Sequence, residues 1–401
     1  MTATFILTFV LLAVLLARLR AESARLRLAR SGVRLRVAVT GIRGKSSVTR
    51  LIAAGLRASG LRVLAKTTGS RPVLILPDGS ESEIVRQGPA SLREQARLLS
   101  RAAALGADAL VVETMSIRPE YLGVEVRGVI QPGLVAVTNV HLDHMEEMGR
   151  TKEEIAASLA SALPEGALVV FPEEELPAAF AAAVLARRAR PVRVAADDAF
   201  SLTPAGGLRS EFAANVRLAA AVLREVGVSE EDAARGMRQA EPDFGSLRAW
   251  LVPLAGPAGR ALCVSAFAAN DPESSAAALS RVRPASGSPP GPLIGLVCLR
   301  DDRPERTGQW LEAAAEGFFE DFARVAFIGR PARAARMKMA KLRPSFAGEF
   351  VFETSPAPAA LMDRLSSGLS GRPVFIGLAN IIGLGESFIA HWEKAGVVHD
   401  L

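Results

Sequence analysis

Residues 39 to 50 read VTGIRGKSSVTR, a glycine-containing stretch of the kind that surrounds nucleotide phosphates. A lysine and a hydroxyl residue follow its second glycine, so Lys45 could neutralise phosphate charge and Ser46 could bind Mg²⁺. The usual phosphate-binding loop has a further glycine five residues before Gly44, where this chain has Val39. The stretch is therefore a chance match at an ordinary turn, a broken phosphate loop, or the phosphate loop of a different class of enzyme.

The residues on either side of the loop favour the phosphate site. Residues 33 to 40 alternate and then run apolar, as a strand does, and residues 46 to 59 carry apolar side chains at helical spacing. Backbone N–H groups between a strand and a helix face a bound phosphate. We therefore predict a nucleotide site here. Its predicted contact residues are Gly41, Arg43, Gly44, Lys45, Ser46 and Ser47.

Polar residues also follow two other apolar runs. Glu113 ends the run 109–113, and a carboxylate at a strand end opposite a phosphate loop is the expected second ligand of a nucleotide-bound Mg²⁺. Asn139 ends the run 133–139, and Asp143 and His144 follow it. Two oxygen ligands and an imidazole in one cluster predict a second metal ion or a substrate contact.

Strand-like and helical stretches alternate along the chain, which predicts an α/β fold with a parallel, doubly wound sheet. The composition changes near residue 245, and a second α/β unit with its own sheet fits the rest. We expect an anchor and a basic helix over 1–32, an ATP-binding domain over 33–244 and a C-terminal α/β domain over 245–401.

The N-terminus predicts attachment to a membrane. Residues 2 to 17 carry no charge, and arginines crowd residues 18 to 36, which keeps that side in the cytoplasm by the positive-inside rule. The run is shorter than the about 20 residues of a usual span, so an interfacial helix is the alternative. Because the basic cluster directly follows the apolar run, we expect a lipid surface and no nucleic acid as its partner. The two cysteines, Cys263 and Cys298, suit a reducing compartment.

Taken together, these residues resemble the Mur ligase family of ATP-dependent amide-bond ligases. The family loop T-G-[TN]-x-G-K-[ST]-[ST] has no upstream glycine, and TGIRGKSS fits it. The resemblance identifies Glu113 with the family's Mg²⁺ glutamate and His144 with its metal-binding histidine. It also places Asn215 near the adenine, and it has the segment from Asn270 through Asp271 to Ser274 facing the nucleotide.

Seven segments further resemble the membrane-linked ligase subunits of poly-γ-glutamate synthesis. They are KTTGSR, REQ, GADALVVETMSIRPE, TNVHLDHMEEMG, AFAANDPES, CLRDDRPERTGQW and FIGLANIIGLGE. The resemblance implies ATP and Mg²⁺ as cofactors, and glutamate and the growing polymer as substrates. It also implies integral-membrane and export subunits as partners.

The mechanism implied is attack of a glutamate carboxylate on the γ-phosphate of ATP, followed by attack of an amine on the acyl phosphate. Lys45, Glu113 and His144 are the expected catalytic residues. Arg300 and Arg303 are expected to contact phosphates or polyanionic product, and Arg71 is the candidate for the glutamate carboxylate.

The sequence departs from the family pattern at several positions, of which the place of a modified lysine is one, and it leaves two alternative functions open. Many Mur ligases have a carbamylated lysine about fourteen residues after the metal histidine, and that place is Ser158 here. A folylpolyglutamate-type ligase is one alternative. A membrane-bound NTPase that energises or gates a transporter is the other.

Overall fold

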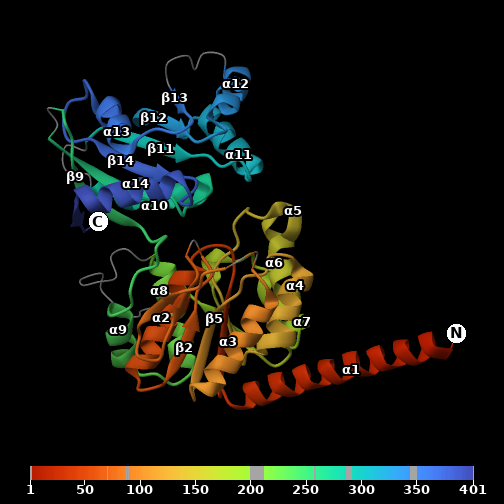
Figure 1. Cartoon of the computed structure of the whole chain (residues 1–401). Coiled ribbons are helices and arrows are strands. Elements are labelled where there is room, and N and C mark those ends of the chain that lie inside the picture. The colour runs from red at the N-terminus through yellow and green to blue at the C-terminus, as the bar shows by residue number, and fades with distance from the viewer. Residues whose placement is uncertain are drawn as a thin grey trace. The chain divides into compact units, whose positions relative to one another are not determined.

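The computed structural model describes residues 2–69, 71–86, 88, 90–198, 212–256, 259–285, 291–343 and 350–400. These residues divide into two compact units: the first ends at Glu241 and the second begins at Pro242 (Figure 1). The first contains an eight-stranded sheet and the second a seven-stranded sheet. Both sheets are rich in parallel strands, which confirms the predicted α/β class.

In the first unit, β1 lies in the middle of the sheet and ends at the glycine loop. The strands lie in the order β4-β3-β2-β5-β1-β6-β7-β8. All pairs from β2 to β8 are parallel, and β3 and β4 add an antiparallel edge. Their bounds are β1 (Leu35–Thr40), β2 (Val63–Lys66), β3 (Val73–Ile75), β4 (Glu81–Glu83), β5 (Ala109–Glu113), β6 (Leu134–Val137), β7 (Leu168–Pro172) and β8 (Arg190–Val194).

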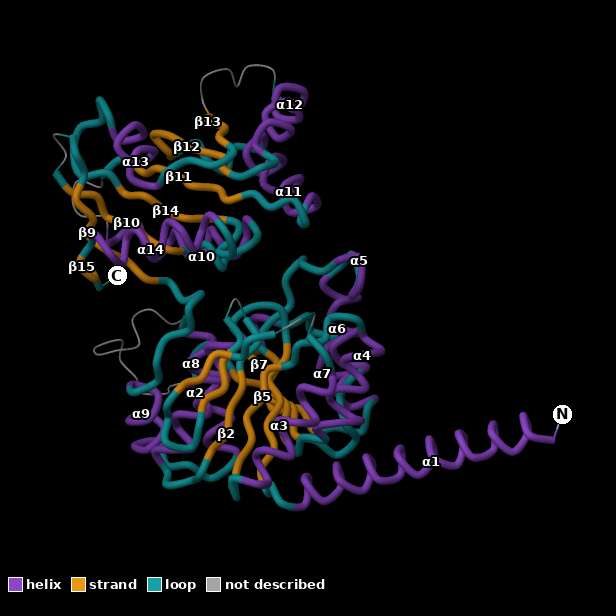
Figure 2. The backbone as a smooth tube through the Cα atoms, viewed as in Figure 1, coloured by secondary structure: helices purple, strands orange, loops and turns teal. Residues whose placement is uncertain are grey.

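Helices cover both faces of this sheet (Figure 2). Successive side chains of a strand point to opposite faces, so Val37 and Val39 of β1 share a core with α2 and α8, whereas Ala38 packs in the core that includes α3. The helices are α2 (Lys45–Ala58), α3 (Leu92–Ala104), α4 (Pro119–Gly123), the π-helix η1 (Val124–Ile130), α5 (Met145–Met148), α6 (Lys152–Ser161), the 3₁₀ turn η2 (Glu173–Glu175), α7 (Phe180–Ala186), α8 (Ala213–Glu225) and α9 (Glu230–Arg238).

The N-terminal apolar run and the basic stretch after it form one continuous helix, α1 (Thr2–Ser31). Its last turns belong to the first unit: Ala29 is buried in the core beside α3, and the Arg30 guanidinium donates to the carbonyls of Gly128 and Val129 in η1. By length and composition alone, Thr4–Ser31 meets the requirements for a helix that crosses a membrane.

In the second unit, β14 is the central strand of the sheet and pairs with β10 on one side and with β11 on the other. The order is β13-β12-β11-β14-β10-β9-β15, with β9 and β15 antiparallel at one edge. The strands are β9 (Arg248–Pro253), β10 (Arg260–Ser265), β11 (Leu293–Cys298), β12 (Phe322–Ile328), β13 (Phe350–Glu353), β14 (Val374–Leu378) and β15 (Val397–His399). The helices are α10 (Pro272–Ala285), α11 (Pro304–Ala315), α12 (Ala332–Leu342), α13 (Pro358–Ser366) and α14 (Leu384–Ala395).

Candidate active site

The loop between β1 and α2 requires both of its glycines. Gly41 has φ 118° and Gly44 has φ 76°, in a region that residues with a Cβ rarely adopt. There is also no room for a side chain, because a Cβ on Gly41 would collide with Thr138 and one on Gly44 with the Asn215 amide. Asn215, predicted near an adenine, thus lies buried against the glycine loop itself.

Lys45, the first residue of α2, folds back over the loop. Its Nζ donates to the carbonyl oxygens of Gly41 at 2.9 Å and Ile42 at 3.1 Å. Burial lowers the pKa of Lys45, and the nearby Glu113 carboxylate opposes that shift. The ammonium therefore lies inside the loop, where a bound phosphate would interact with its positive charge and accept hydrogen bonds from the loop N–H groups.

Ser46 and Glu113 meet at the carboxyl ends of neighbouring strands. The Ser46 hydroxyl donates to Glu113 Oε2 at 2.7 Å, and the Thr68 N–H donates to the same oxygen at 2.7 Å. Glu113 is 3% exposed. A hydroxyl and a carboxylate in direct contact form an oxygen donor set of the kind that Mg²⁺ or Mn²⁺ prefers, so these two residues fit the predicted metal ligands.

Arg43 joins the glycine loop to the segment after β6. Its N–H donates to Asn139 Oδ1 at 2.8 Å, and Asn139 Nδ2 returns a hydrogen bond to the Arg43 carbonyl at 3.2 Å. The guanidinium pairs with Asp143 at 2.8 Å. Since Asp143 precedes His144, this ion pair brings the predicted metal-binding histidine to the same edge of the sheet as the loop.

His144 itself occupies a constrained backbone position. It has φ 54°, which is uncommon for a residue other than glycine, and its N–H donates to Asp143 Oδ1 at 2.9 Å. Ser158, in the place of the family's modified lysine, donates to the Met148 carbonyl at 2.6 Å and so holds the end of α5. Ser158 thus has a structural role here, and its hydroxyl cannot replace the modified lysine of the family.

Two further predicted residues of the first unit are at least partly exposed to solvent. Ser47 is half-buried in the first turn of α2, and Arg71 is exposed in the segment between β2 and β3.

A buried polar network that was not predicted from the sequence lies behind Glu113. Lys66, at the end of β2, contacts Glu94 and Gln95 of α3, and Gln95 in turn contacts Glu125 of η1. Lys66 and Glu125 are both fully buried. The only sequence signal was indirect: a lysine closes an otherwise apolar strand, and both KTTGSR and REQ are among the segments that carry the family resemblance.

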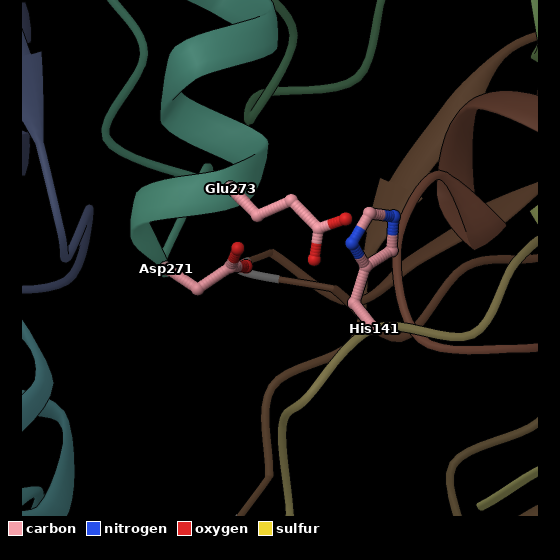
Figure 3. A group of neighbouring side chains, drawn as sticks. All are labelled: His141, Asp271 and Glu273. Atoms are coloured by element: carbon pink, nitrogen blue, oxygen red, sulfur yellow. The ribbon is translucent and has the colours of Figure 1, made fainter. Parts of the chain in front are cut away.

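In the second unit, Asn270 and Asp271 lie at the start of α10. Asp271 caps this helix, accepting from the Ser274 N–H and hydroxyl at 2.8 Å each. The Asn270 carbonyl accepts from Trp310 Nε1 at 2.9 Å. Figure 3 shows Asp271 and Glu273 on this turn and, from the first unit, His141 in the segment after β6.

Arg300 and Arg303 follow β11 and differ in their contacts. Arg300 forms a paired contact with Asp302, two residues away, at 2.9 and 2.6 Å. Arg303 precedes the first residue of α11, and its buried Nε has no hydrogen-bond partner among the residues that the structure describes. That buried N–H group is the feature of Arg303 that suits an anionic ligand.

A second long-range polar contact in this unit was not predicted from the sequence. Arg306 of α11, 7% exposed, donates to Asn380 Oδ1 at 2.7 Å, and Asn380 Nδ2 donates to the Cys298 carbonyl at 2.7 Å. Asn380 follows Ala379, a buried residue with φ 78°. A strained backbone at a strand end is common at functional sites, so FIGLANIIGLGE carried a signal that the sequence alone did not resolve.

The chain matches two family models: the Mur ligase middle domain over residues 39–202 and the poly-gamma-glutamate synthase CapB C-terminal domain over residues 252–395. Solved structures share the fold. MurF from Acinetobacter baumannii aligns with a TM-score of 0.65 at 15% identity, over 93% of this chain and 79% of MurF. A bifunctional folylpolyglutamate synthase/dihydrofolate synthase from Yersinia pestis, solved with AMPPNP and Mn, aligns with a TM-score of 0.62 at 16% identity, over 94% and 92%.

The family models and the curated relatives make this chain an ATP-dependent amide ligase of the Mur ligase class, whose fold the solved structures share. Among curated relatives, PGA synthase CapB of Bacillus subtilis is 32% identical over 271 residues, 66% of this chain and 67% of the relative. The capsule biosynthesis protein CapB of Bacillus anthracis is 34% identical over 273 residues, 66% of this chain and 57% of the relative. The chain belongs to the CapB family of poly-γ-glutamate synthases.

Proposed function

We propose that this protein uses ATP to join glutamate residues through amide bonds and so extends poly-γ-glutamate. The observation that carries the proposal is the contact of Ser46 and Glu113 beside the glycine loop that holds Lys45. Family membership supports glutamate as the substrate, because the relatives are poly-γ-glutamate synthases by name. Family membership also favours this function over those of a folylpolyglutamate-type ligase and of an NTPase that energises a transporter.

The reaction has two steps. A carboxylate oxygen of glutamate or of the growing chain attacks the γ-phosphorus of ATP, the bond to the bridging oxygen breaks, and ADP leaves. The amine of the incoming substrate then attacks the acyl carbon, phosphate leaves with the bond electrons, and the amine loses a proton to the medium. Positioning and charge neutralisation supply most of the catalysis in phosphoryl transfer, so the protein has little covalent chemistry to perform.

The residues of the glycine loop hold the nucleotide in this scheme. Lys45 turns its ammonium from the loop carbonyls to the β- and γ-phosphates, and the backbone N–H groups from Gly41 to Ser47 surround them. Asn139 and Arg43 brace the loop. Asn215, in contact with Gly44, fixes the loop from the α8 side and contacts the nucleotide.

Ser46 and Glu113 would hold Mg²⁺, and His144 would hold a second ion or orient the acyl phosphate. A bound Mg²⁺ neutralises charge on the transferring phosphoryl group. In the second unit, Asn270 and Asp271 face the nucleotide, and Arg300 and Arg303 contact phosphate or the polyanionic product. Arg71 pairs with a glutamate carboxylate, for which a guanidinium provides two parallel N–H donors.

We also infer where the enzyme works. The length and composition of α1 support a membrane anchor, and the arginines after its apolar part favour a cytoplasmic catalytic side. The integral-membrane and export subunits of a poly-γ-glutamate synthase complex are then its partners. A pull-down of the full chain from membranes, compared with a chain lacking residues 2–17, tests this: loss of the partners in the truncated chain is expected.

The function is tested by incubating membranes that carry the protein with ATP, Mg²⁺ and labelled glutamate. The expected result is glutamate-dependent ADP release and a labelled polymer whose linkage analysis gives γ-amide bonds. ADP release without glutamate would support the NTPase instead, and conversion of a folate substrate in place of polymer would support the folylpolyglutamate-type ligase.

A further inference from the structure

Glu125 is a fully buried carboxylate that the proposed reaction does not use. It belongs to η1 and is 0% exposed. Its Oε1 accepts from Gln95 Nε2 at 2.6 Å and from the Met115 N–H at 3.1 Å, and its Oε2 accepts from the Ser116 N–H at 2.9 Å. A buried charge is costly unless it is hydrogen-bonded, so the three donors explain how the carboxylate is tolerated, but not why it is there.

The segment that Glu125 holds is the continuation of β5. Met115 and Ser116 come two and three residues after Glu113, whose side chain contacts Ser46 and Thr68. The Thr114 N–H donates to the Val39 carbonyl at 2.9 Å, which fixes this stretch to β1. Glu125 therefore ties down the backbone immediately beyond the strand end from which the Glu113 carboxylate projects.

Gln95 connects the two glutamates directly. The same Nε2 that donates to Glu125 also donates to the Glu113 main-chain carbonyl at 3.3 Å. The Gln95 Oε1 accepts from Lys66 Nζ at 3.1 Å, and since an ammonium can only donate, the amide nitrogen must face the two glutamates. The orientation of the amide is thus set by Lys66, which Glu94 holds at 2.5 Å.

The helix that carries Glu125 has an unusual geometry. Residues Val124–Ile130 form a π-helix, a conformation that is rare and frequently found at functional sites. Its C-terminal end accepts a hydrogen bond from Arg30 at Val129 and one from Arg36 at Ile130, the latter at 3.1 Å, while Glu125 itself anchors the other end through its three donors. Glu125 is therefore a rigidly mounted acceptor, and the segment after Glu113 is positioned against it.

We propose that Glu125 is a positioning residue for the metal site: it fixes the strand end of Glu113 so that the Glu113 carboxylate and the Ser46 hydroxyl converge on one divalent ion. This inference rests on the proposed function, because it takes Glu113 and Ser46 as the metal ligands. Residues behind the ligands of a metal site orient them, and their loss costs about 10–100-fold in metal affinity.

The substitution that isolates this role is Glu125→Gln. Glutamine keeps the size of the side chain but replaces one acceptor oxygen by a donor NH₂ group, so at least one of the three N–H groups loses its acceptor and faces the new NH₂ group. The segment 114–116 must shift, and Glu113 with it. Among the described residues, neither the glycine loop nor Lys45 forms a hydrogen bond with Glu125, and Glu125 affects the pKa of Lys45 less than Glu113, Arg43 or Asp143 does. Nucleotide binding without metal should therefore change less than twofold.

The experiment is calorimetric titration of the purified full chain with Mn²⁺ in the presence of AMPPNP, and with AMPPNP alone. Glu125→Gln should weaken Mn²⁺ binding about tenfold, while AMPPNP binding stays within twofold of wild type. Glu120→Gln is the matched control, because Glu120 is exposed on the adjoining α4. Glu125→Asp keeps a shorter carboxylate, and its affinity should lie between those of wild type and Glu125→Gln.

The outcomes separate the two proposals. If wild type binds no Mn²⁺, or if Glu113→Ala binds it as tightly as wild type, the metal assignment itself fails. If wild type and Glu113→Ala differ as expected but a folded Glu125 variant binds Mn²⁺ like wild type, only the positioning role is overturned. An equal loss in Mn²⁺ and AMPPNP binding would likewise overturn it, because a general loss of structure would explain both. Should Glu125→Gln not fold, the Asp variant decides by the same criterion.

Discussion

The two units both place polar residues beyond the carboxyl ends of parallel strands, but they hold them in different ways. In the first unit, residues from four segments interlock: Glu113 with Ser46 and Thr68, and Arg43 with Asn139 and Asp143. In the second unit, Asp271 caps its own helix and Arg300 pairs with Asp302 in the same turn. The first arrangement is fixed before any ligand binds, which is what charge stabilisation in catalysis requires.

The second unit also contains long-range contacts, and a buried one joins two residues for which no role was predicted. Arg306 and Asn380 connect α11, the end of β14 and the Cys298 carbonyl at the end of β11. The first unit thus holds its candidate catalytic residues by contacts between distant segments, whereas in the second unit the Arg306 contact stabilises the fold.

The largest effect is expected at Lys45. Lys45→Ala removes the ammonium that the loop holds for the phosphates, and ATP-dependent polymer formation should fall at least about 10²–10³-fold. Labelled-polymer yield measures it. Lys338→Ala is the control, since Lys338 is an exposed residue of α12. A Lys45→Ala protein that forms polymer at the wild-type rate would contradict the assignment of the loop.

Arg306→Met should have the largest effect on the stability of the second unit. It leaves the buried Asn380 oxygen without its donor, which costs about 1–3 kcal/mol. Denaturant unfolding followed by tryptophan fluorescence measures the loss, since all three tryptophans lie in this unit. Arg333→Met, at an exposed position of α12, is the matched control. Equal stability of the two variants would remove the proposed framework role of Arg306.

Glu94→Gln tests the buried network of the first unit and its dependence on pH. Burial would raise the pKa of Glu94, but hydrogen bonds from Arg86 and Lys66 outweigh it and lower the pKa to about 2. The ionised carboxylate therefore stabilises the folded chain above its ordinary pKa of 4.5, and this contribution is lost as the pH falls from there toward 2.

In Glu94→Gln the buried Lys66 ammonium loses its carboxylate, and we expect a loss of about 2 kcal/mol at neutral pH. Thermal unfolding followed from about pH 6 to about pH 2 should show a shallower acid dependence for the variant than for wild type. Glu83→Gln, exposed in β4, provides the control. Parallel pH profiles for Glu94→Gln and wild type would speak against the pair.

A smaller effect is expected for the ion pair of Arg43 and Asp143. Both side chains are mostly buried, with 19% and 15% exposure, and we expect a coupling free energy of about 1 kcal/mol. A double-mutant cycle of Arg43→Ala and Asp143→Ala, measured by denaturant unfolding, gives this value. Additive single effects would show that the pair does not link the loop to the His144 segment.

The smallest effect on stability is expected at Arg300. Its partner Asp302 is mostly exposed, so Arg300→Ala should change the free energy of unfolding by about 0.5 kcal/mol or less. If Arg300 contacts phosphate or product, polymer formation should nevertheless fall severalfold. Arg330→Ala, with a loose and exposed contact to Asp301, is the control. Activity and stability that both remain at the wild-type level would exclude a role for Arg300.

The sequence predicted those parts of the site whose residues are adjacent along the chain. Strand, glycine loop and helix follow one another without interruption, and Lys45 and Ser46 are adjacent, so the pattern predicted the cradle. The network of Lys66, Gln95 and Glu125 was not predicted, because its hydrogen bonds join residues 29 and 30 positions apart. Only the packing of α3 and η1 against β2 and β5 brings these side chains together.

The fold shows the same limit at its edges. The buried strands β1 and β5 were predicted from apolar runs, whereas β8 was not, because Arg190–Val194 reads RPVRV and carries a proline and two arginines. Such a sequence suits an edge strand, where one side needs no pairing. The π-helix η1 was not predicted either, since Val124–Ile130 reads VEVRGVI, in which apolar and charged residues alternate as they do in a strand.

The way α1 joins the first unit has a mechanical consequence. Only residues 32–34 separate the helix from β1, and Arg30, Arg36 and Ala29 fasten its last turns to η1 and α3. If α1 lies in a bilayer, the position and tilt of the first unit relative to the membrane are set by the helix. The helix is rigid and about 45 Å long, so the candidate ATP-binding site would change its orientation only together with α1. A flexible insert at residue 32 would therefore uncouple the orientation of the site from that of the helix.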